Sequence, residues 1–328
     1  MANQLVSIVA GGAGFIGVNL IPKLVNEGRH VAVIDNMSRG RANYVYSLPK
    51  NLQSSISIFE GDCVDSKFLS HVFESIQSRG DVIDEVWHLA ANSDIPAGVK
   101  DANVDLKDTF MSTFSLIQAM KEFGISNLHF ASSSAIYGDL GAAVLHESIG
   151  PLLPISNYGA MKLASEALAS ASAEAFLERV NLFRFPNVVG VPATHGVILD
   201  FVKKLMLTPA HLDVLGDGTQ QKSYLHVSDL VSAMLIIRAQ HTASKVCVVN
   251  IGPIDEGVTV KWIAEQVVKR VSQDAQIKFG IGNKGWVGDV PKFAYSTKKL
   301  QSYSWKPELD SAGAVIRAID EIAIQLGR

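Results

Sequence analysis

The chain has 328 residues, and its 29 basic and 32 acidic side chains give a formal net charge of −3. Hydrophobic residues make up 48% of it, enough for a substantial core in one large or two modest domains. The balanced charge argues against nucleic acid or a membrane as a partner. The two cysteines, Cys63 and Cys247, lack metal-ligand spacing, so we expect reduced thiols, no metal site and a cytoplasmic protein. The sequence also shows no basic leader and no apolar stretch of membrane-spanning length, so we expect neither a leader nor a membrane span.

The first predicted elements are a buried strand over 5–10 and a helix over 15–27, joined by a glycine-rich turn. Gly11, Gly14 and Gly17 are spaced three residues apart. This spacing provides a tight turn, lets backbone N–H groups approach a pyrophosphate, and lets the helix pack closely on the sheet. The positive end of the helix then faces the phosphates. We therefore predict a dinucleotide site here, with an ordinary βα turn as the alternative.

A second predicted strand, over 30–35, ends in Asp35. A carboxylate at this point can accept both hydroxyls of the adenosine ribose and repel a 2′-phosphate, so we predict NAD as the cofactor. The alternative is a helix-capping or solvated acid. Arg39 and Arg41 follow closely and leave NADP use open.

Predicted strands and helices alternate through the first half of the chain, which indicates a doubly wound parallel sheet of the Rossmann type. The strands are expected at 5–10, 30–35, 56–60, 82–89, 126–132 and 180–185, and the helices at 15–27, 65–78, 101–123 and 158–178. After about residue 186 the pattern breaks. A strand and helix near 224–240 and a strand at 246–251 are expected to return to the sheet, and helices near 259–272 and 310–326 to form a second lobe. We expect an NAD-binding domain over 1–185 with return segment 224–252, and a smaller α/β substrate lobe over 186–223 and 253–328.

A catalytic pair is predicted at Tyr158 and Lys162, which share one face of a helix because they lie four residues apart. A phenol with a pKa of about 10 is a poor base at neutral pH, but a neighbouring ammonium favours the phenolate. The strand before them runs into Ser132-Ser133-Ser134, where a hydroxyl can share a substrate proton with the tyrosine. Taken singly, these residues also fit a packed aromatic, a surface lysine and a polar loop.

Together these motifs resemble an extended short-chain dehydrogenase/reductase of the NAD-dependent nucleotide-sugar epimerase family, the UDP-glucose 4-epimerase-like group. The resemblance extends over essentially all 328 residues. It rests on the segments 11–17, 61–62, 88–91, 132–138, 158–162, 184–190, 216–220 and 288–291.

The resemblance implies a catalytic serine at Ser133, counted back from Tyr137-Gly138, with Tyr158 as base and Lys162 as its partner. It implies cofactor contacts at Gly11, Gly14, Phe15, Ile16, Asp35, Asn36, Ser38, Asp62, Cys63, Leu89, Ala90, Ala91, Thr109, Tyr158, Lys162 and Pro186. It implies substrate contacts at Ser93, Asp94, Ser133, Ser134, Tyr158, Asn187, Val197, Lys222, Tyr224 and Trp286.

Two positions help to choose the reaction. Related sugar dehydratases carry an acid pair directly after the catalytic residue, whereas this chain has Ser134 and Ala135. The expected function is therefore 4-epimerisation of a nucleotide-diphosphate sugar, through transient oxidation at C4 and return of the hydride. A net dehydrogenase or reductase acting on a nucleotide-linked hexose or heptose is the alternative, and a non-catalytic dinucleotide sensor is a third.

Three departures from the family pattern leave the sugar and the nucleotide open. Lys222 and Trp286 replace two arginines, and Thr109 replaces an asparagine. Lysine keeps the charge without the bidentate fork, and Trp286 suits either stacking on a ligand or packing. Asp94 suits either a sugar hydroxyl or a helix cap.

The helices expected at 101–123 and 158–178 carry apolar residues on more than one face. One face must cover the sheet. In relatives the other forms a four-helix interface, so we expect a homodimer, unless the second lobe covers this surface.

Overall fold

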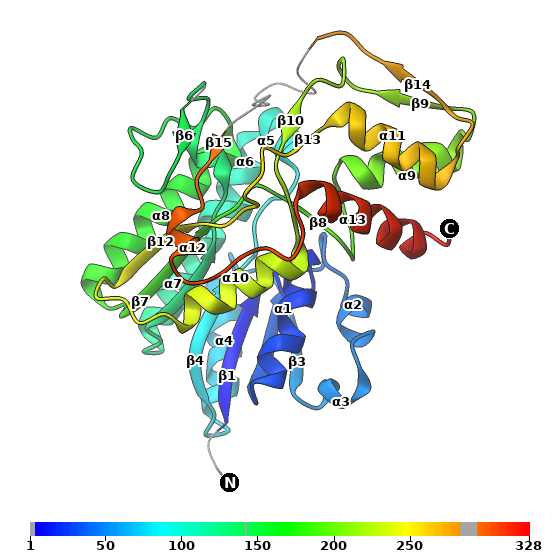
Figure 1. Ribbon diagram of the computed structural model, residues 1–328. Helices are drawn as coiled ribbons and strands as arrows, with labels where there is room; N and C mark the ends of the chain where they lie inside the picture. Colours follow the sequence, from blue (N-terminus) through cyan, green and yellow to red (C-terminus); the bar gives the residue numbers. More distant parts are fainter. Residues whose placement is uncertain (1–3, 142, 283–293) are drawn as a thin grey trace. The chain divides into compact units, whose positions relative to one another are not determined.

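The computed structural model describes residues 4–141, 143–282 and 294–328. The chain divides into two compact units, each discontinuous in sequence (Figure 1). The first comprises residues up to Ile136, then Leu153–Arg184 and Ile237–Val249, and the second comprises Tyr137–Leu152, Phe185–Ile236 and Asn250–Arg328. Residues 137–152, which the sequence placed with the cofactor domain, thus belong to the second unit.

The first unit is built on a seven-stranded sheet in the order β12-β7-β5-β4-β1-β2-β3. The paired strands from β3 to β7 run parallel. This order, with β1 between β4 and β2 and the chain running outward from it in both directions, is the Rossmann arrangement that the alternating pattern predicted. The strands are β1 (Leu5–Ala10), β2 (His30–Asp35), β3 (Ile56–Glu60), β4 (Val82–His88), β5 (Asn127–Ala131), β7 (Arg179–Arg184) and β12 (Val246–Asn250).

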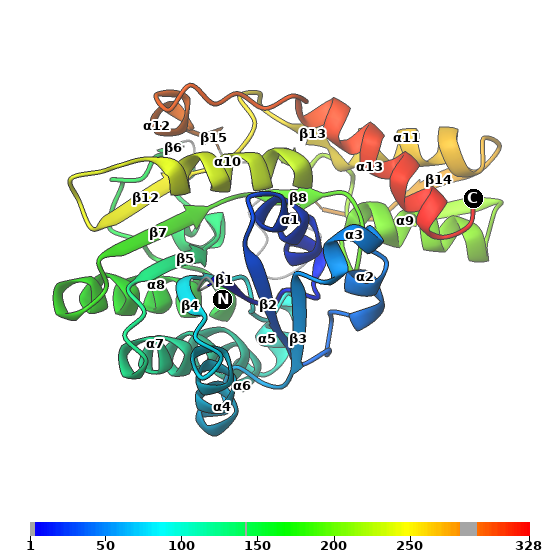
Figure 2. The same cartoon turned by 90° about the horizontal axis from the view of Figure 1, so that it is seen from below.

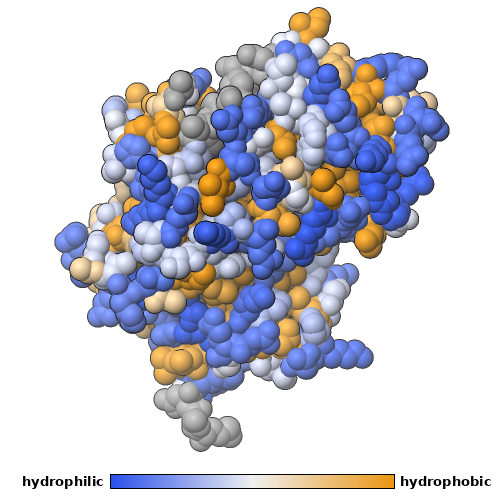
Figure 3. All heavy atoms as spheres, viewed as in Figure 1, coloured by the Kyte–Doolittle hydropathy of each residue, from blue (hydrophilic) through white to orange (hydrophobic). Residues whose placement is uncertain are grey.

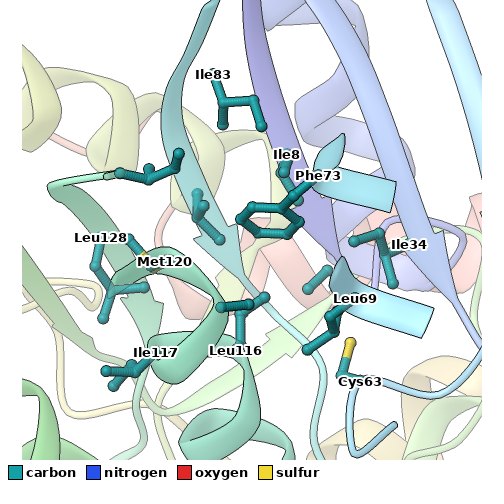
Figure 4. Packing of buried hydrophobic residues seen from close by; sticks show 14 of the residues in the cluster. Ile8, Ile34, Cys63, Leu69, Phe73, Ile83, Leu116, Ile117, Met120 and Leu128 are labelled. Atoms are coloured by element: carbon teal, nitrogen blue, oxygen red, sulfur yellow. The ribbon is translucent and has the colours of Figure 1, made fainter. Parts of the chain in front are cut away.

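Helices cover both faces of this sheet (Figure 2). On one face, α4, α7 and α8 pack on strand residues in a large apolar core, part of which is seen in Figure 4. Helix α1 contacts β1 and β2 from the opposite face. The helices of this unit are α1 (Phe15–Asn26), α2 (Ala42–Tyr46), α3 (Lys50–Gln53), α4 (Ser66–Gln77), α5 (Ile95–Lys100), α6 (Ala102–Asp105), the π-helix η1 (Leu106–Met111), α7 (Ser112–Glu122), the 3₁₀ helix η2 (Ser134–Tyr137), which runs into the second unit, and α8 (Asn157–Ala175).

The single helix expected over 101–123 is instead three consecutive segments, with the π-helical turn in the middle. Short π-helical insertions are rare and are frequent at functional sites. Neither this turn nor the short helices α2, α3 and α5 were predicted from the sequence.

The second unit has its own apolar core, which gathers residues of α9, α11 and α13. The strand expected near 224 does not return to the large sheet: β11 pairs with β8 in a separate two-stranded sheet, and only β12 joins the large one. The elements are β6 (Val144–Leu145), β8 (Asn187–Val189), α9 (Val197–Leu207), β9 (His211–Val214), β10 (Gln221–Lys222), β11 (Tyr224–His226), α10 (Val227–Ala239), which continues into the first unit, β13 (Val258–Thr259), α11 (Val260–Val271), β14 (Gln276–Phe279), β15 (Ala294–Tyr295), α12 (Lys298–Gln301) and α13 (Ser311–Gln325).

On the face seen in Figure 3, hydrophilic residues are interspersed with hydrophobic ones, as the balanced composition suggests. Among the described helices, none is both long and apolar enough to span a bilayer.

Candidate active site

The glycine turn brings backbone, rather than side chains, to the carboxyl end of β1. Gly11 has φ +79°, and a Cβ there would lie 2.6 Å from the backbone nitrogen of Ala90. A Cβ on Gly17 would lie 2.5 Å from the Cα of Gly12, so this glycine lets α1 pack against the turn. Within the described residues, α1 has neither a side-chain cap at Gly14 nor an acid in its first turn. Its positive end is therefore available to a pyrophosphate.

Asp35 fastens this turn to the end of β2. Its side chain is 7% exposed, and its two oxygens accept the backbone N–H groups of Ala13 (3.0 Å) and Met37 (2.9 Å). Burial raises the pKa of Asp35, and the two backbone hydrogen bonds oppose that rise. A carboxylate offers about four lone-pair sites, so acceptor capacity remains for ribose hydroxyls. The geometry fits the dinucleotide site that the sequence predicted.

The loop after β3 supplies the predicted adenine-side residues. Asp62 accepts the N–H of Val64 at 3.1 Å and pairs with the ammonium of Lys107, also at 3.1 Å. Cys63 is buried, and burial, reinforced by the nearby carboxylates, raises the pKa of its thiol to about 12. The thiol is therefore protonated at neutral pH and packs in the apolar core (Figure 4).

The segment after β4 is held by polar side chains. The backbone N–H of Asn92 donates to the Thr109 hydroxyl (3.2 Å), and the side-chain amide of Asn92 donates to Asp105 (2.8 Å). Asp94 caps α5 by accepting the N–H of Ala97 at 3.1 Å. Its other oxygen pairs with Arg39 at 2.7 Å. Asp94 thus has the capping role that the sequence left open.

The catalytic candidates Ser133, Tyr158 and Lys162 come together at the carboxyl end of β5 and the start of α8. The Ser133 oxygen accepts the N–H of Ala135 (3.1 Å), and its hydroxyl is hydrogen-bonded to the Tyr158 phenol. Lys162, 2% exposed, donates to the Ala131 carbonyl at 2.6 Å and lies 5.9 Å from the Tyr158 ring centroid.

Two local features define the start of α8 and its packing against η2, the short helix that follows β5. Ser156 caps the helix by accepting the N–H of Gly159 at 3.1 Å. A Cβ on Gly159 would lie 2.5 Å from the Ala135 carbonyl oxygen, so only glycine lets the helix approach this closely after Tyr158.

The electrostatics of the pair differ from the sequence expectation. Burial, with a smaller contribution from the Asp105 carboxylate, raises the pKa of Tyr158 to about 12. The Ser133 hydrogen bond favours the phenolate and offsets only part of this rise. Burial lowers the pKa of Lys162 to about 7, against the pull of Glu166 and Asp105. In this structure the burial of Tyr158 therefore outweighs the Ser133 hydrogen bond that favours its phenolate.

Several polar residues behind this pair were missed from sequence. Glu166 accepts from the Ser132 hydroxyl (2.5 Å) and forms an ion pair with Arg184 (2.6 Å). Its position four residues after Lys162, on the same helix face, was a usable signal. Asp105 is fully buried, and its Oδ2 has no hydrogen-bond partner among the described residues. Nothing in the sequence pattern marked Asp105.

The other predicted residues fall into three groups. Phe15, Ile16, Asn36, Ser38, Leu89, Ala90, Ala91, Ser93 and Ser134 belong to the first unit, in or beside the turns at the carboxyl ends of β1, β2, β4 and β5. Pro186, Asn187, Val197, Lys222 and Tyr224 belong to the second unit, where Asn187 and Tyr224 are register partners of β8 and β11. Trp286 lies outside the described residues.

Comparison with known proteins agrees with this geometry. A model of the NAD-dependent epimerase/dehydratase family matches residues 7–252. The UDP-glucose 4-epimerase of Lacticaseibacillus casei is 28% identical, and the match covers 94% of this chain and 93% of the relative. A crystal structure of UDP-galactose 4-epimerase is 33% identical with a TM-score of 0.84, covering 98% of this chain and 99% of that one. The UDP-glucose 4-epimerase of Thermotoga maritima, solved with UDP-glucose, is 25% identical with a TM-score of 0.84, covering 98% and 99%.

The chain belongs to the NAD-dependent epimerase/dehydratase family. It is therefore an enzyme whose cofactor is NAD, as the glycine turn and Asp35 predicted.

Proposed function

We propose that this chain is a UDP-hexose 4-epimerase. The observation that carries the proposal is the assembly of Ser133, Tyr158 and Lys162 beside the glycine turn, with Ser134 and Ala135 where a dehydratase has acids. The names of its relatives support uridine diphosphate as the nucleotide and C4 as the reacting carbon.

The residues present fit NAD. The uncapped helix N-terminus and close-packed Gly11 suit the pyrophosphate, and the Asp35 carboxylate suits the ribose. When bound, NAD would supply the acceptor and donor of the C4 hydride and the positive charge of its oxidised nicotinamide ring. The protein side chains then have to move one proton and hold the sugar in place.

We assign the proton to Tyr158. Its phenolate accepts the proton of the C4 hydroxyl, and the resulting phenol returns it when the alcohol is re-formed; Ser133 donates a hydrogen bond that favours the phenolate. Because burial and the nearby Asp105 raise the pKa of Tyr158 to about 12 despite the Ser133 hydrogen bond, the base depends on positive charge beside it. Lys162, buried one helical turn away, supplies that charge when protonated.

We assign substrate binding to the second unit, which makes it the substrate lobe. Asn187 and Lys222 are polar groups suited to the two phosphates, and Tyr224 lies beside Asn187 in the β8–β11 pair. A lysine binds phosphate as a point charge, without the bidentate geometry of arginine. We therefore expect this chain to hold the diphosphate less rigidly than a relative with arginine.

The test is to incubate the purified protein with UDP-glucose or UDP-galactose and to follow the C4 configuration by NMR. Interconversion in both directions without net NADH absorbance supports the proposal. Stoichiometric NADH accumulation would instead identify a net dehydrogenase. UDP-N-acetylhexosamines, and GDP-, CDP- and dTDP-sugars, tried in parallel, define the sugar and the base.

We also propose a homodimer built on η1, α7 and α8. The apolar residues of these helices divide between two directions: Leu116 and Ile117 are fully buried in the core, whereas Leu106 and Phe114 are 43% and 39% exposed. Light scattering at micromolar concentration should give twice the chain mass. Phe114→Asp should shift the protein toward monomer, and a monomeric wild-type protein would contradict the proposal.

A further inference from the structure

An ion pair crosses the cofactor end of the large sheet. Arg39 follows β2 and Asp94 follows β4, and in the sheet these strands flank β1. The Arg39 Nη2 lies 2.7 Å from the Asp94 Oδ2. The pair therefore passes over the carboxyl end of β1, where the glycine turn begins. It joins the loop after β2, which follows the Asp35 carboxylate, to the loop after β4.

Arg39 stands where it would reach a 2′-phosphate. The next residue, Gly40, packs against the Asp35 carboxylate, because a Cβ on Gly40 would lie 2.8 Å from Asp35 Oδ2. The backbone N–H of Arg41 also donates to the Ala13 carbonyl at 3.1 Å, so this loop folds back on the glycine turn. A guanidinium beside the ribose carboxylate is the group that accommodates NADP in this fold.

Asp94 is fixed independently of Arg39. Its Oδ1 caps α5 through the N–H of Ala97. Its backbone N–H donates to the side chain of Asn92 at 2.9 Å, and its carbonyl accepts from the same side chain at 2.9 Å. The Asp94 carboxylate is therefore a fixed anion toward which the flexible arginine is drawn.

We propose that Asp94 is a specificity-determining residue that selects NAD over NADP by holding Arg39 away from the 2′ position. A 2′-phosphate would have to take the guanidinium from the Asp94 carboxylate, and without it would meet the Asp35 carboxylate with no cation beside it. NAD has no 2′-phosphate and needs no contact from Arg39. The proposal concerns the cofactor only and does not depend on which sugar is epimerised.

The test is direct binding of NAD and NADP, by calorimetry, to protein freed of cofactor. Asp94→Asn keeps a good N-cap for α5 but releases Arg39. We expect the Kd for NADP to fall by about 10-fold, the effect of one charge-assisted hydrogen bond, with the Kd for NAD nearly unchanged. In Asp94→Asn/Arg39→Gln the gain should disappear. Asp81→Asn is the matched control, because it breaks another arginine–aspartate pair, Arg79–Asp81 at 3.4 Å, before β4 begins.

Two outcomes of the Asp94→Asn measurement would overturn the proposal. The first is an unchanged NADP Kd in Asp94→Asn; the second is an equal weakening of NAD and NADP, which would make the pair a strap over either cofactor. Arg39→Gln alone provides a second measurement should Asp94→Asn fold poorly. Because Asp94 is present in this variant, we expect its NADP affinity to stay within about 2-fold of wild type, which corresponds to roughly 0.4 kcal/mol. A large loss of NADP affinity would show that Arg39 already binds the 2′-phosphate and would overturn the proposal. None of these measurements needs a sugar substrate.

Discussion

Two buried polar clusters lie on opposite faces of the same strands in the first unit, and they are built differently. The Glu85 cluster, formed by Ser7, Arg29, Glu85, Trp87, His129, Asn181 and Arg238, packs against one face. The catalytic candidates Ser133, Tyr158 and Lys162 lie at the carboxyl end, on the face covered by α8. The alternation of side chains along β4 and β5 separates the two clusters.

Every charge in the Glu85 cluster is matched. The two Glu85 oxygens accept from Ser7 (2.7 Å), Trp87 (3.0 Å) and His129 (3.1 Å) and pair with Arg238 (2.7 Å). Burial opposes the charge on Glu85, but these partners hold its pKa well below the usual range. His129 accepts from the Asn181 amide at 2.9 Å, and burial lowers its pKa, so its imidazole is neutral.

The charges of the catalytic candidates are not balanced by partners in this way. Burial acts against the charged forms of both Tyr158 and Lys162 and moves their pKa values in opposite directions, to about 12 and about 7. Nearby, His88 Nδ1 and Asp105 Oδ2 lack hydrogen-bond partners within the described part of the chain. Buried groups with perturbed pKa values are typical of functional sites. The comparison thus separates a cluster that stabilises the fold from one suited to chemistry.

The largest effect is expected from a change in the catalytic candidates. Tyr158→Phe removes the proton acceptor and keeps the ring, so turnover on the true UDP-sugar should fall by about 10²- to 10⁴-fold. NAD affinity and the free energy of unfolding should change little. Tyr46→Phe, at a tyrosine that is 64% exposed, makes the same chemical change as a control. Near-wild-type turnover of Tyr158→Phe would move the base elsewhere.

The opposite pattern is expected for the Glu85 cluster. Glu85→Gln puts an amide among donors and leaves Arg238 without its buried anion, so the free energy of unfolding should fall by about 3–5 kcal/mol. The Kd for NAD should stay the same, because Glu85 lies in mid-strand. Asp84→Asn is the control, since Asp84 is 33% exposed, pairs with Arg29 at 2.7 Å and should contribute only about 0–1 kcal/mol. Urea unfolding measures both.

The stabilisation from Glu85 should also depend on pH with a defined sign. Its pKa is lowered in the folded state, whereas in the unfolded chain it is about 4.3. The contribution is therefore fully present above about pH 4.3 and is lost as pH falls below it. The difference in unfolding free energy between wild type and Glu85→Gln should be constant from about pH 6 to 7 and shrink near about pH 3. A difference that grows on acidification would contradict the assignment.

The sequence predicted the sheet well and the polar clusters unevenly. Strand periodicity and the glycine turn depend on local patterns, so β1 to β5 were located to within about two residues. The catalytic tyrosine and lysine were found because both lie on one helix. Glu85 and His129 were not found, because a single polar residue in a buried strand shows its partner only when the strands are paired. The pairing of β11 with β8 and the burial of Asp105 are tertiary facts of the same kind.

The smallest expected effects concern two neighbouring serines, Ser132 and Ser133. The Ser132 hydroxyl donates to Glu166, which also holds Arg184, whereas the Ser133 hydroxyl is bonded to the Tyr158 phenol. Ser132→Ala leaves a buried carboxylate with one donor fewer and should lower the free energy of unfolding by about 1–3 kcal/mol, with turnover nearly retained. Ser133→Ala removes a hydrogen bond to the phenolate and should reduce turnover by about 10- to 100-fold, with stability nearly unchanged. Turnover and urea unfolding, measured on both variants, check this. If both changes reduce turnover to a similar extent, the division into a structural Ser132 and a catalytic Ser133 is wrong.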